Sequence, residues 1–118
     1  MEPDGHTTSQ FPDSAALRET TRWVVGKLGP EFQTDRITFT FPVLNSSAEV
    51  ILFVSGPEKA ALVAEVLQPN GPQKYPVQGV KPRNGTKRWM LDASAAADLR
   101  TTRGVSAPIN QRNRFLFQ

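Results

Sequence analysis

Residues 50–67 read VILFVSGPEKAALVAEVL. The first five are a continuous apolar run, which is typical of a strand that is covered on both faces in a parallel sheet. Ser55 then offers a helix cap, with a proline in the first turn and Glu58 three residues after the serine. Apolar residues recur at spacings of three and four to the end of the stretch, which predicts an amphipathic helix over 56–67. A buried strand that leads directly into a helix indicates an α/β fold.

Upstream of this stretch, residues 36–41 read RITFTF and alternate between polar and apolar side chains. Period-two alternation of aromatic and β-branched residues predicts a strand with one buried face. We expect Ile37, Phe39 and Phe41 to form that face. The segment 42–45, PVLN, then ends the strand and begins a short turn or helix.

Shorter signals predict four further elements: a helical turn within 13–22, a strand at 23–28, a strand at 88–91, and an alanine-rich helix at 93–99 with Asp92 as its N-cap. One sheet is expected to contain the strands 36–41, 50–54 and 88–91. The helix at 56–67 would pack on that sheet, because its apolar stripe needs a partner surface.

The start of the predicted helix at 56–67 is a candidate anion site. Unpaired backbone N–H groups and the partial positive charge of a helix N-terminus favour phosphate. Gly56 lets a ligand approach the backbone closely, and Lys59 adds a full charge in the first turn. The alternative is that Lys59 is a solvated surface residue, which is the commoner fate of a first-turn lysine.

A second candidate site lies in residues 3–12, PDGHTTSQFP, which contain the only histidine of the chain. Histidine exchanges a proton readily near neutral pH, so His6 is the candidate general base. Gly5 permits the backbone angles of a tight turn, and Asp4 either orients the imidazole or shapes the turn. The alternative is a solvated histidine in a terminal arm. With one histidine and no cysteine, we expect no metal and no cofactor.

Residues 4–12 resemble the Asp-Gly-His-Thr-Ala-Ser-Leu-Phe-Pro signature of the 6-phosphogluconolactonases, with Thr8 and Gln10 as departures. The similarity continues in chain order at the strand that enters 42–45 and at a tryptophan-to-alanine segment at 89–97. Residues 56–60 are similar to a Gly-x-x-Lys-Ala segment of the related glucosamine-6-phosphate deaminases, in which the lysine contacts phosphate. The resemblance implies a partial Rossmann-like three-layer fold, the C-terminal half of the sugar-phosphate isomerase and lactonase fold.

The resemblance also implies an activity, the hydrolysis of 6-phospho-glucono-1,5-lactone to 6-phosphogluconate in the pentose phosphate pathway. It implies catalytic roles for His6 and Asp4, and substrate or phosphate contacts for Gly5, Gly56, Lys59 and Arg36. For Arg36, which opens the alternating strand, the alternative is an ion pair on the surface. The related glucosamine-6-phosphate deaminases are a second candidate, but the Thr-x-Ser-x-Phe-Pro pattern after the histidine favours the lactonases. A third candidate is an inactive half-fold that serves as a binding or structural module.

Three segments are expected along the chain: an active-site-like loop at 1–12, an α/β domain at 13–99 and a basic, disordered tail at 100–118. We expect the loop to be poorly ordered, since terminal segments fray unless they are tied down. We also expect the isolated chain to have little activity, because the family's phosphate loop and Asp-Glu-Arg segment have no counterpart in it.

Composition narrows the possible partners. No apolar run approaches the ~20 residues that span a bilayer. The net charge is +3 and forms no concentrated basic stripe with aromatic platforms, which argues against a nucleic-acid partner. The absence of cysteine fits a reducing, cytoplasmic compartment. The partner that the resemblance implies is a phosphorylated sugar lactone.

Overall fold

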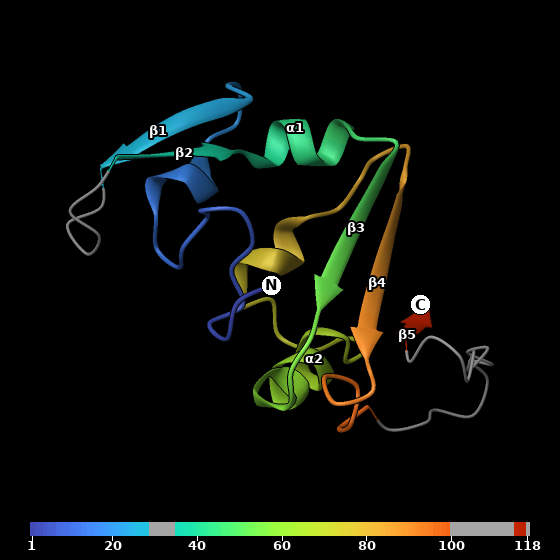
Figure 1. Ribbon diagram of the computed structural model, residues 1–118. Coiled ribbons are helices and arrows are strands. Elements are labelled where there is room, and N and C mark those ends of the chain that lie inside the picture. Colours follow the sequence, from blue (N-terminus) through green and yellow to red (C-terminus); the bar gives the residue numbers. More distant parts are fainter. Residues whose placement is uncertain (29–34, 100–114, 118) are drawn as a thin grey trace.

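The computed structural model describes residues 1–28, 35–99 and 115–117, and it divides the strands between two small sheets (Figure 1). In chain order the elements are η1 (Ala15–Arg18), β1 (Val24–Leu28), β2 (Asp35–Phe39), α1 (Phe41–Ser46), β3 (Glu49–Val54), η2 (Pro57–Lys59), α2 (Ala60–Val66), η3 (Pro76–Gly79), β4 (Thr86–Asp92) and β5 (Phe115–Phe117). Strands β1 and β2 form one antiparallel pair. Strands β3 and β4 pair in parallel, and β5 joins β4 in the antiparallel direction.

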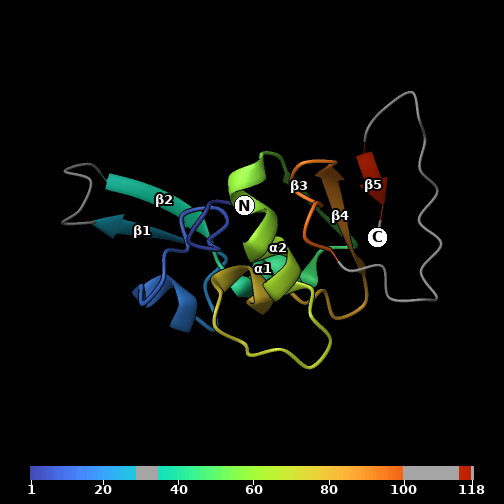
Figure 2. The same ribbon diagram turned by 90° about the horizontal axis from the view of Figure 1, so that it is seen from below.

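The strand predicted at 36–41 forms as β2, but it does not join the sheet of β3 and β4. The strand stops at Phe39, and α1 begins at Phe41 with Pro42 in its first turn. Proline suits the start of a helix and cannot donate to a strand ladder, so it ends the strand here. The two sheets consequently lie on opposite sides of α1 and α2 (Figure 2). The prediction of one shared sheet is therefore wrong for β2. The other predictions hold: the strand at 23–28 forms as β1, the strand at 88–91 forms as β4, and the turn at 42–45 lies in α1.

The core lies between α2 and one face of the β3–β4 sheet. Leu52 and Val54 from β3 are buried beside Trp89 and Leu91 from β4, and Val63 from α2 packs against them. These side chains come from alternate positions on each strand, so they share one face of the sheet. The helix predicted over 56–67 and its packing on the sheet are thus confirmed, with η2 as its first turn.

The opposite face of β3 is uncovered. Ile51 exposes 41% of its surface and Phe53 exposes 63%. The prediction that the run at 50–54 is covered on both faces is therefore wrong within the described residues. The reason is that α2 covers only the side of the sheet that carries Leu52. In addition, β3 is an outer strand of its sheet, so it has a strand neighbour only in β4.

The buried face of β2 is also the reverse of the predicted one. Thr38 and Thr40 are 3% and 0% exposed, whereas Ile37 and Phe39 expose 79% and 54%. The Ser9 N–H donates to Thr38 Oγ1 over 3.0 Å, and Thr40 Oγ1 donates to the carbonyl just before β1 over 3.0 Å. Because buried hydroxyls are tolerated when they have partners, these bonds let the threonine side face inward.

Asp92 caps the segment that follows it, as predicted, but this segment forms turns rather than a helix. Asp92 Oδ1 accepts hydrogen bonds from the Ala95 N–H at 2.7 Å and from Ser94 Oγ at 2.8 Å. Farther on, the N–H groups of Ala97 and Leu99 donate to carbonyls three residues earlier. Bonds of this spacing belong to turns and 3-10 geometry, so the predicted α-helix at 93–99 is wrong.

The tail predicted to be disordered, 100–118, lies outside the described residues except for β5, which pairs with Met90–Asp92 of β4. In the described ranges, no helix is long and apolar enough to cross a membrane.

Candidate functional site

The loop of residues 1–12 is held by hydrogen bonds to several elements. Within the loop, the Gly5 N–H donates to the Glu2 carbonyl over 2.9 Å. The Val77 N–H of η3 donates to the Gly5 carbonyl over 3.0 Å, and the Ser9 N–H binds β2 through Thr38. These bonds supply partners that an unattached terminus lacks, so they argue against a poorly ordered loop, while its order in the isolated chain stays a prediction.

Gly5 is required by the geometry of this loop. Its φ is 78°, in the left-handed region, and a Cβ added to it would lie 2.6 Å from Tyr75 Cδ1. Only glycine fits a backbone that approaches an aromatic ring so closely at this φ. The structure thus gives Gly5 a role in packing the loop against Tyr75, while substrate binding by this residue stays a prediction.

Asp4 and His6 form a hydrogen-bonded pair in the loop. His6 Nδ1 lies 2.6 Å from Asp4 Oδ1, and the His6 main-chain N–H donates to the same oxygen over 3.1 Å. Asp4 therefore both orients the imidazole and shapes the turn, the two roles that sequence reasoning treated as alternatives. Burial acts to raise the pKa of Asp4, but the hydrogen bonds from the His6 main chain and side chain outweigh it and hold this pKa below its usual value. A carboxylate at Nδ1 fixes the tautomer that leaves Nε2 free to accept a proton.

The His6 side chain is 12% exposed, and it lines a cavity of about 560 Å³. The other lining residues are Glu2, Pro3, Asp4, Thr8, Phe11 and Arg36. The structure thus brings Arg36 of β2 to the same cavity as the Asp4–His6 pair, although about thirty residues of sequence separate them. A guanidinium in such a place binds anionic groups such as phosphate.

Phe11 is a site residue that the sequence reasoning missed. Its ring centroid is 4.3 Å from that of His6, and Arg36 Cζ lies 5.9 Å from the centroid of the Phe11 ring. The ring therefore packs on the imidazole and lies within cation–π range of the guanidinium. The signal was present in the quoted signature, where a phenylalanine follows the histidine at a fixed spacing.

Gly56 and Lys59 do not line this cavity. Lys59 Nζ donates to the Ser55 carbonyl over 2.8 Å and lies 3.3 Å from Glu58 Oε1. The Gly56 N–H donates to Asp92 Oδ2 over 3.2 Å. Asp92, which sequence reasoning used only as a cap for 93–99, thus occupies the position where an anion was expected. A phosphate contact by Gly56 or Lys59 remains a prediction.

No group of three or more His, Asp and Glu side chains that could hold a metal ion occurs in the part of the chain that the structure describes. Around His6 the structure places a hydrogen-bonded carboxylate, Asp4, and a guanidinium, that of Arg36, which lines the same cavity. Groups of these types can exchange a proton and bind an anion, so the catalytic roles of His6 and Asp4 remain predictions.

Comparisons with known proteins agree with this description. A family model described as glucosamine-6-phosphate isomerases/6-phosphogluconolactonase matches residues 1–89. The chain belongs to this family.

Among relatives, a Mycobacterium tuberculosis protein named 6-phosphogluconolactonase is 44% identical over 100 residues, which are 84% of this chain and 40% of that protein. A Chlamydia muridarum protein of the same name is 38% identical over 98 residues, 81% of this chain and 38% of the relative. A solved structure of the Trypanosoma brucei 6-phosphogluconolactonase is 26% identical with a TM-score of 0.73, covering 85% of this chain and 40% of that one.

The chain therefore spans about two fifths of the length of these relatives. The comparisons confirm the family and a partial α/β fold. The expectation that the matched part is the C-terminal half of the family fold is not confirmed by them.

Proposed function

We propose that the Asp4–His6 site, in a protein that carries the complete family fold, hydrolyses 6-phospho-glucono-1,5-lactone to 6-phosphogluconate. The observation that carries the proposal is the 2.6 Å contact between His6 Nδ1 and Asp4 Oδ1 in a cavity that Arg36 also lines. Relatives named 6-phosphogluconolactonase support this substrate class over an amino sugar phosphate.

In this proposal His6 acts as the general base. Nε2 takes a proton from water as the water oxygen attacks the lactone carbonyl carbon. The bond between that carbon and the ring oxygen then breaks, and the ring oxygen takes the proton back from the His6 imidazolium to become a hydroxyl, which returns His6 to its neutral form. A lactone is an activated ester, so neither a covalent nucleophile nor a metal is needed. A positioned base of this kind contributes typically ~10²–10⁴-fold to the rate.

Asp4 and Arg36 have separate parts in the proposal. Asp4 holds the imidazole in the tautomer with Nε2 unprotonated, and its charge stabilises the imidazolium that forms. Arg36 binds the phosphate of the substrate and holds the lactone in the cavity. The chain alone is expected to have little activity, because it spans about two fifths of its relatives and a site needs all of its walls to position a substrate. A cytoplasmic location stays a prediction.

A chimera tests the proposal: this chain joined to the part of the Mycobacterium tuberculosis relative that it does not match. Release of 6-phosphogluconate is measured with the chimera and with the isolated chain. We expect turnover by the chimera, and His6→Ala should lower its kcat by ~10²–10⁴-fold with little change in KM.

Asp4→Asn is the informative second variant. An amide oxygen still accepts the His6 N–H bond that shapes the turn, but it carries no charge, so kcat should fall by less than in His6→Ala while the thermal midpoint is kept. A chimera that folds, turns over the lactone and keeps its kcat in His6→Ala would contradict the proposed role of His6.

A further inference from the structure

Thr8 has an uncommon backbone conformation beside the cavity that contains His6. Its φ is 56°, in the left-handed region, which a β-branched residue seldom adopts. Thr8 lines that cavity of about 560 Å³, and it also lines a second one, of about 160 Å³, against β2. A residue in such a conformation persists only where the surrounding structure holds it, so its neighbours must supply the contacts that keep it there.

The Thr8 hydroxyl belongs to a chain of hydrogen bonds that ends on β2. Thr38 Oγ1 donates to Thr8 Oγ1 over 3.1 Å, and Thr8 Oγ1 donates to the Thr7 carbonyl over 2.5 Å. The Ser9 N–H donates to the same Thr38 hydroxyl over 3.0 Å. The signature that residues 4–12 resemble has alanine in place of Thr8, and an alanine side chain could not make the bond to Thr38. The two hydroxyls thus join the loop to a strand that follows it by thirty residues.

The bonded face of β2 also carries Arg36. Side chains two residues apart on a strand point to the same side, so Arg36 and Thr38 share the face that meets the loop. Ile37, on the other face, is 79% exposed. A shift of β2 by one residue against the loop would bring Ile37 to the loop and turn Arg36 away from the cavity. The bond between the two threonines therefore favours the face of β2 that puts a cation in the cavity of His6.

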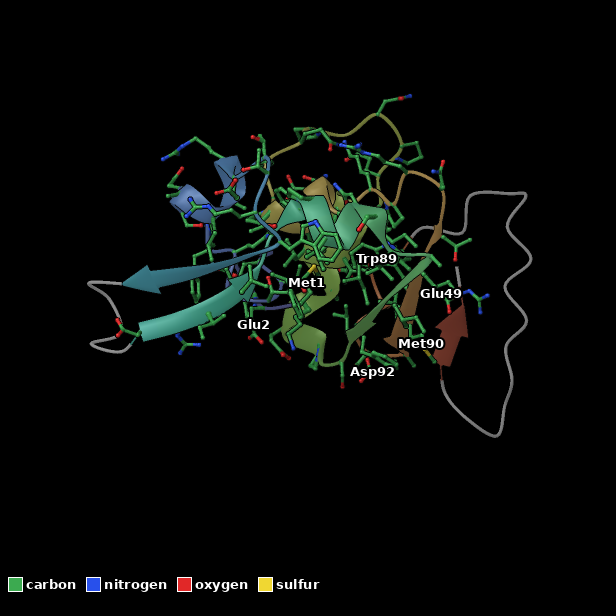
Figure 3. All side chains as sticks on the ribbon, turned by 90° about the horizontal axis from the view of Figure 1, so that it is seen from above. Met1, Glu2, Glu49, Trp89, Met90 and Asp92 are labelled. Carbon is green, nitrogen blue, oxygen red and sulfur yellow. The ribbon has the colours of Figure 1, made fainter. Side chains whose placement is uncertain are left out.

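The position of the loop agrees with this contact. Residues 1–12 lie between β2 and α2 (Figure 2). Glu2 of the loop lies toward β2, whereas Glu49 lies at the other sheet (Figure 3), and Glu2 lines the same cavity as Arg36. A bond between the loop and β2 therefore determines how side chains from the two segments meet in the cavity.

We propose that Thr8 is a positioning residue of the His6 site: through its hydrogen bond with Thr38, it keeps Arg36 of β2 in the cavity. The role rests on the proposed function, in which Arg36 binds the phosphate of the lactone. The hydroxyl proton of Thr8 is already donated to the Thr7 carbonyl, so Thr8 acts through Arg36 and not as a donor to the substrate. The alternative is that the main-chain bond from Ser9 holds Thr38 in place without Thr8.

The first test measures the position of Arg36 in the chain itself by NMR. Arg36 Cζ lies 5.9 Å from the centroid of the Phe11 ring, so the wild type should show nuclear Overhauser effects between protons of the two side chains. Thr8→Val keeps the branched shape and removes only the hydroxyl, so these effects should be lost. Thr8→Ser keeps the hydroxyl and should retain them. Their absence in the wild type, or their survival in Thr8→Val, would overturn the proposal.

A matched control separates this effect from a general loss of stability. Thr86→Val makes the same change at an exposed position of β4 and should leave the Phe11–Arg36 effects unchanged. The melting midpoint is measured for each variant. Loss of the effects in Thr86→Val as well as in Thr8→Val would overturn the proposal, because the position of Arg36 would then not depend on the bond to Thr38.

The second test uses turnover by the chimera as a graded measure. Thr8→Val should raise KM for the phosphorylated lactone by about 3- to 10-fold with little change in kcat, and Thr8→Ser should restore KM. Thr38→Val should raise KM at least as much, and adding Thr8→Val to it should raise KM no further, because the two hydroxyls act as one unit. A multiplied loss in the double variant, or a fall in kcat at constant KM, would overturn the proposal. A chimera that turns over no lactone would count against the proposed function, and the NMR result alone would then decide the role of Thr8.

Discussion

Ser55 Oγ donates a hydrogen bond to Asp92 Oδ2 over 2.6 Å, and this contact joins the end of β3 to the end of β4. The Gly56 N–H donates to the same carboxylate over 3.2 Å. Hydrogen bonds from the Ser55 hydroxyl and the Ala95 N–H, with smaller contributions from other donors, hold the pKa of Asp92 far below its usual value. The negative charge that the start of η2 favours is therefore supplied by the protein itself.

Replacing Asp92 by Asn should lower the thermal midpoint, because the amide cannot accept all the bonds that the carboxylate accepts. A carboxyl group whose pKa is depressed on folding stabilises the protein above its unfolded pKa, and this contribution is lost as the pH falls toward the folded pKa. Melting curves between pH 7 and pH 3 should show a gap between wild type and Asp92→Asn that narrows on acidification. Asp98→Asn, the same change at an exposed position, is the control. Equal losses in both variants would count against the link between the strands.

Gln10 contains a buried oxygen without a partner. The side chain is 0% exposed, and its Nε2 donates to the Phe39 carbonyl over 2.8 Å, but Oε1 has no hydrogen-bond partner in the described part of the chain. A buried unpaired polar atom costs about 1–3 kcal/mol. Gln10→Leu should therefore raise the free energy of unfolding by about 1 kcal/mol, measured by urea denaturation.

Gln78 is the matched control for Gln10, since it is also buried but bonded at both ends. Its Oε1 accepts the Tyr75 N–H at 2.9 Å, and its Nε2 donates to the Pro72 carbonyl over 3.1 Å. Gln78→Leu should lower the free energy of unfolding by about 1–3 kcal/mol, because it leaves these main-chain groups unpaired. If both leucine variants shifted stability in the same direction, the unpaired oxygen would not be the cause.

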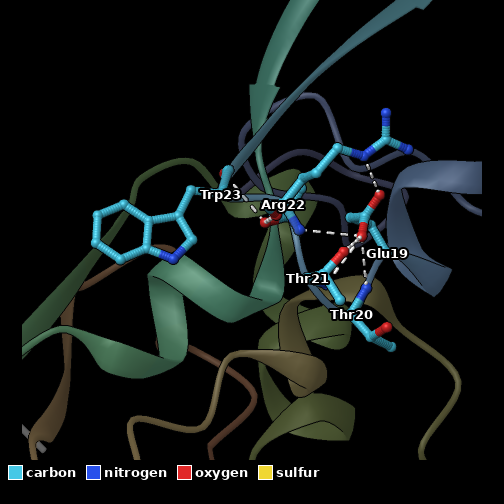
Figure 4. Close-up of polar contacts among 6 residues, drawn as sticks. Glu19, Thr20, Thr21, Arg22 and Trp23 are labelled. Atoms are coloured by element: carbon cyan, nitrogen blue, oxygen red, sulfur yellow. Dashed lines mark hydrogen bonds and ion pairs between the residues drawn. The ribbon is translucent and has the colours of Figure 1, made fainter.

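Glu19 organises the turn that leads into β1 (Figure 4). Its carboxylate accepts hydrogen bonds from the main-chain N–H groups of Thr21 and Arg22. It also forms an ion pair with Arg22, whose Nε lies 2.7 Å from Glu19 Oε2. The main-chain bonds from Thr21 and Arg22 are the largest causes that lower the pKa of Glu19 to about 2. Its stabilising contribution is therefore present above the usual pKa of about 4.5 and lost as the pH falls toward about 2.

Glu19→Gln should remove that pH dependence, and Arg22→Met should remove only part of it, since the main-chain bonds remain. The measurement is the urea midpoint of each protein between pH 6 and pH 3. The difference between wild type and Glu19→Gln should shrink as the pH falls, and a constant difference would show that the carboxylate's charge is not what stabilises the turn.

Arg36 and Lys59 are both candidates for the phosphate contact, and they can be separated in the completed chimera. Arg36→Met should raise KM for the phosphorylated lactone with little change in kcat, since the contact is made equally in the ground and transition states. A charge-assisted bond is worth about 1.5–3 kcal/mol, or roughly 10- to 150-fold. Lys59→Met should raise KM less, because Lys59 does not line the cavity that contains His6. A larger rise in KM for Lys59→Met than for Arg36→Met would place the phosphate at the start of η2.

A lactone without phosphate is the control for both substitutions. It offers nothing for a cation to bind, so the loss caused by Arg36→Met should shrink with this substrate. An equal loss with both lactones would mean that Arg36 supports the cavity wall through its contact with Phe11 instead of binding the phosphate.

Local patterns in the sequence predicted most of the secondary structure and the candidate base. The strand at 50–54 and the helix after it depend on apolar spacing and a proline in the first turn, which act within a few residues. The turn around Gly5 likewise depends on neighbours in the chain, as does the Asp4–His6 contact two residues apart. Such features can be predicted because the groups that interact are close in sequence.

What the tertiary structure alone decided is which surfaces are covered and which charges meet. Alternation at 36–41 showed that β2 has two faces, but Thr38 and not Ile37 is buried, because the Ser9 N–H comes from a distant loop to bind the threonine hydroxyl. The carboxylate of Asp92 reaches Gly56 only because β3 and β4 are parallel neighbours whose ends lie together. Burial and charge pairing depend on contacts between segments far apart in the chain. A local sequence pattern does not specify which distant segment will pack against a given strand.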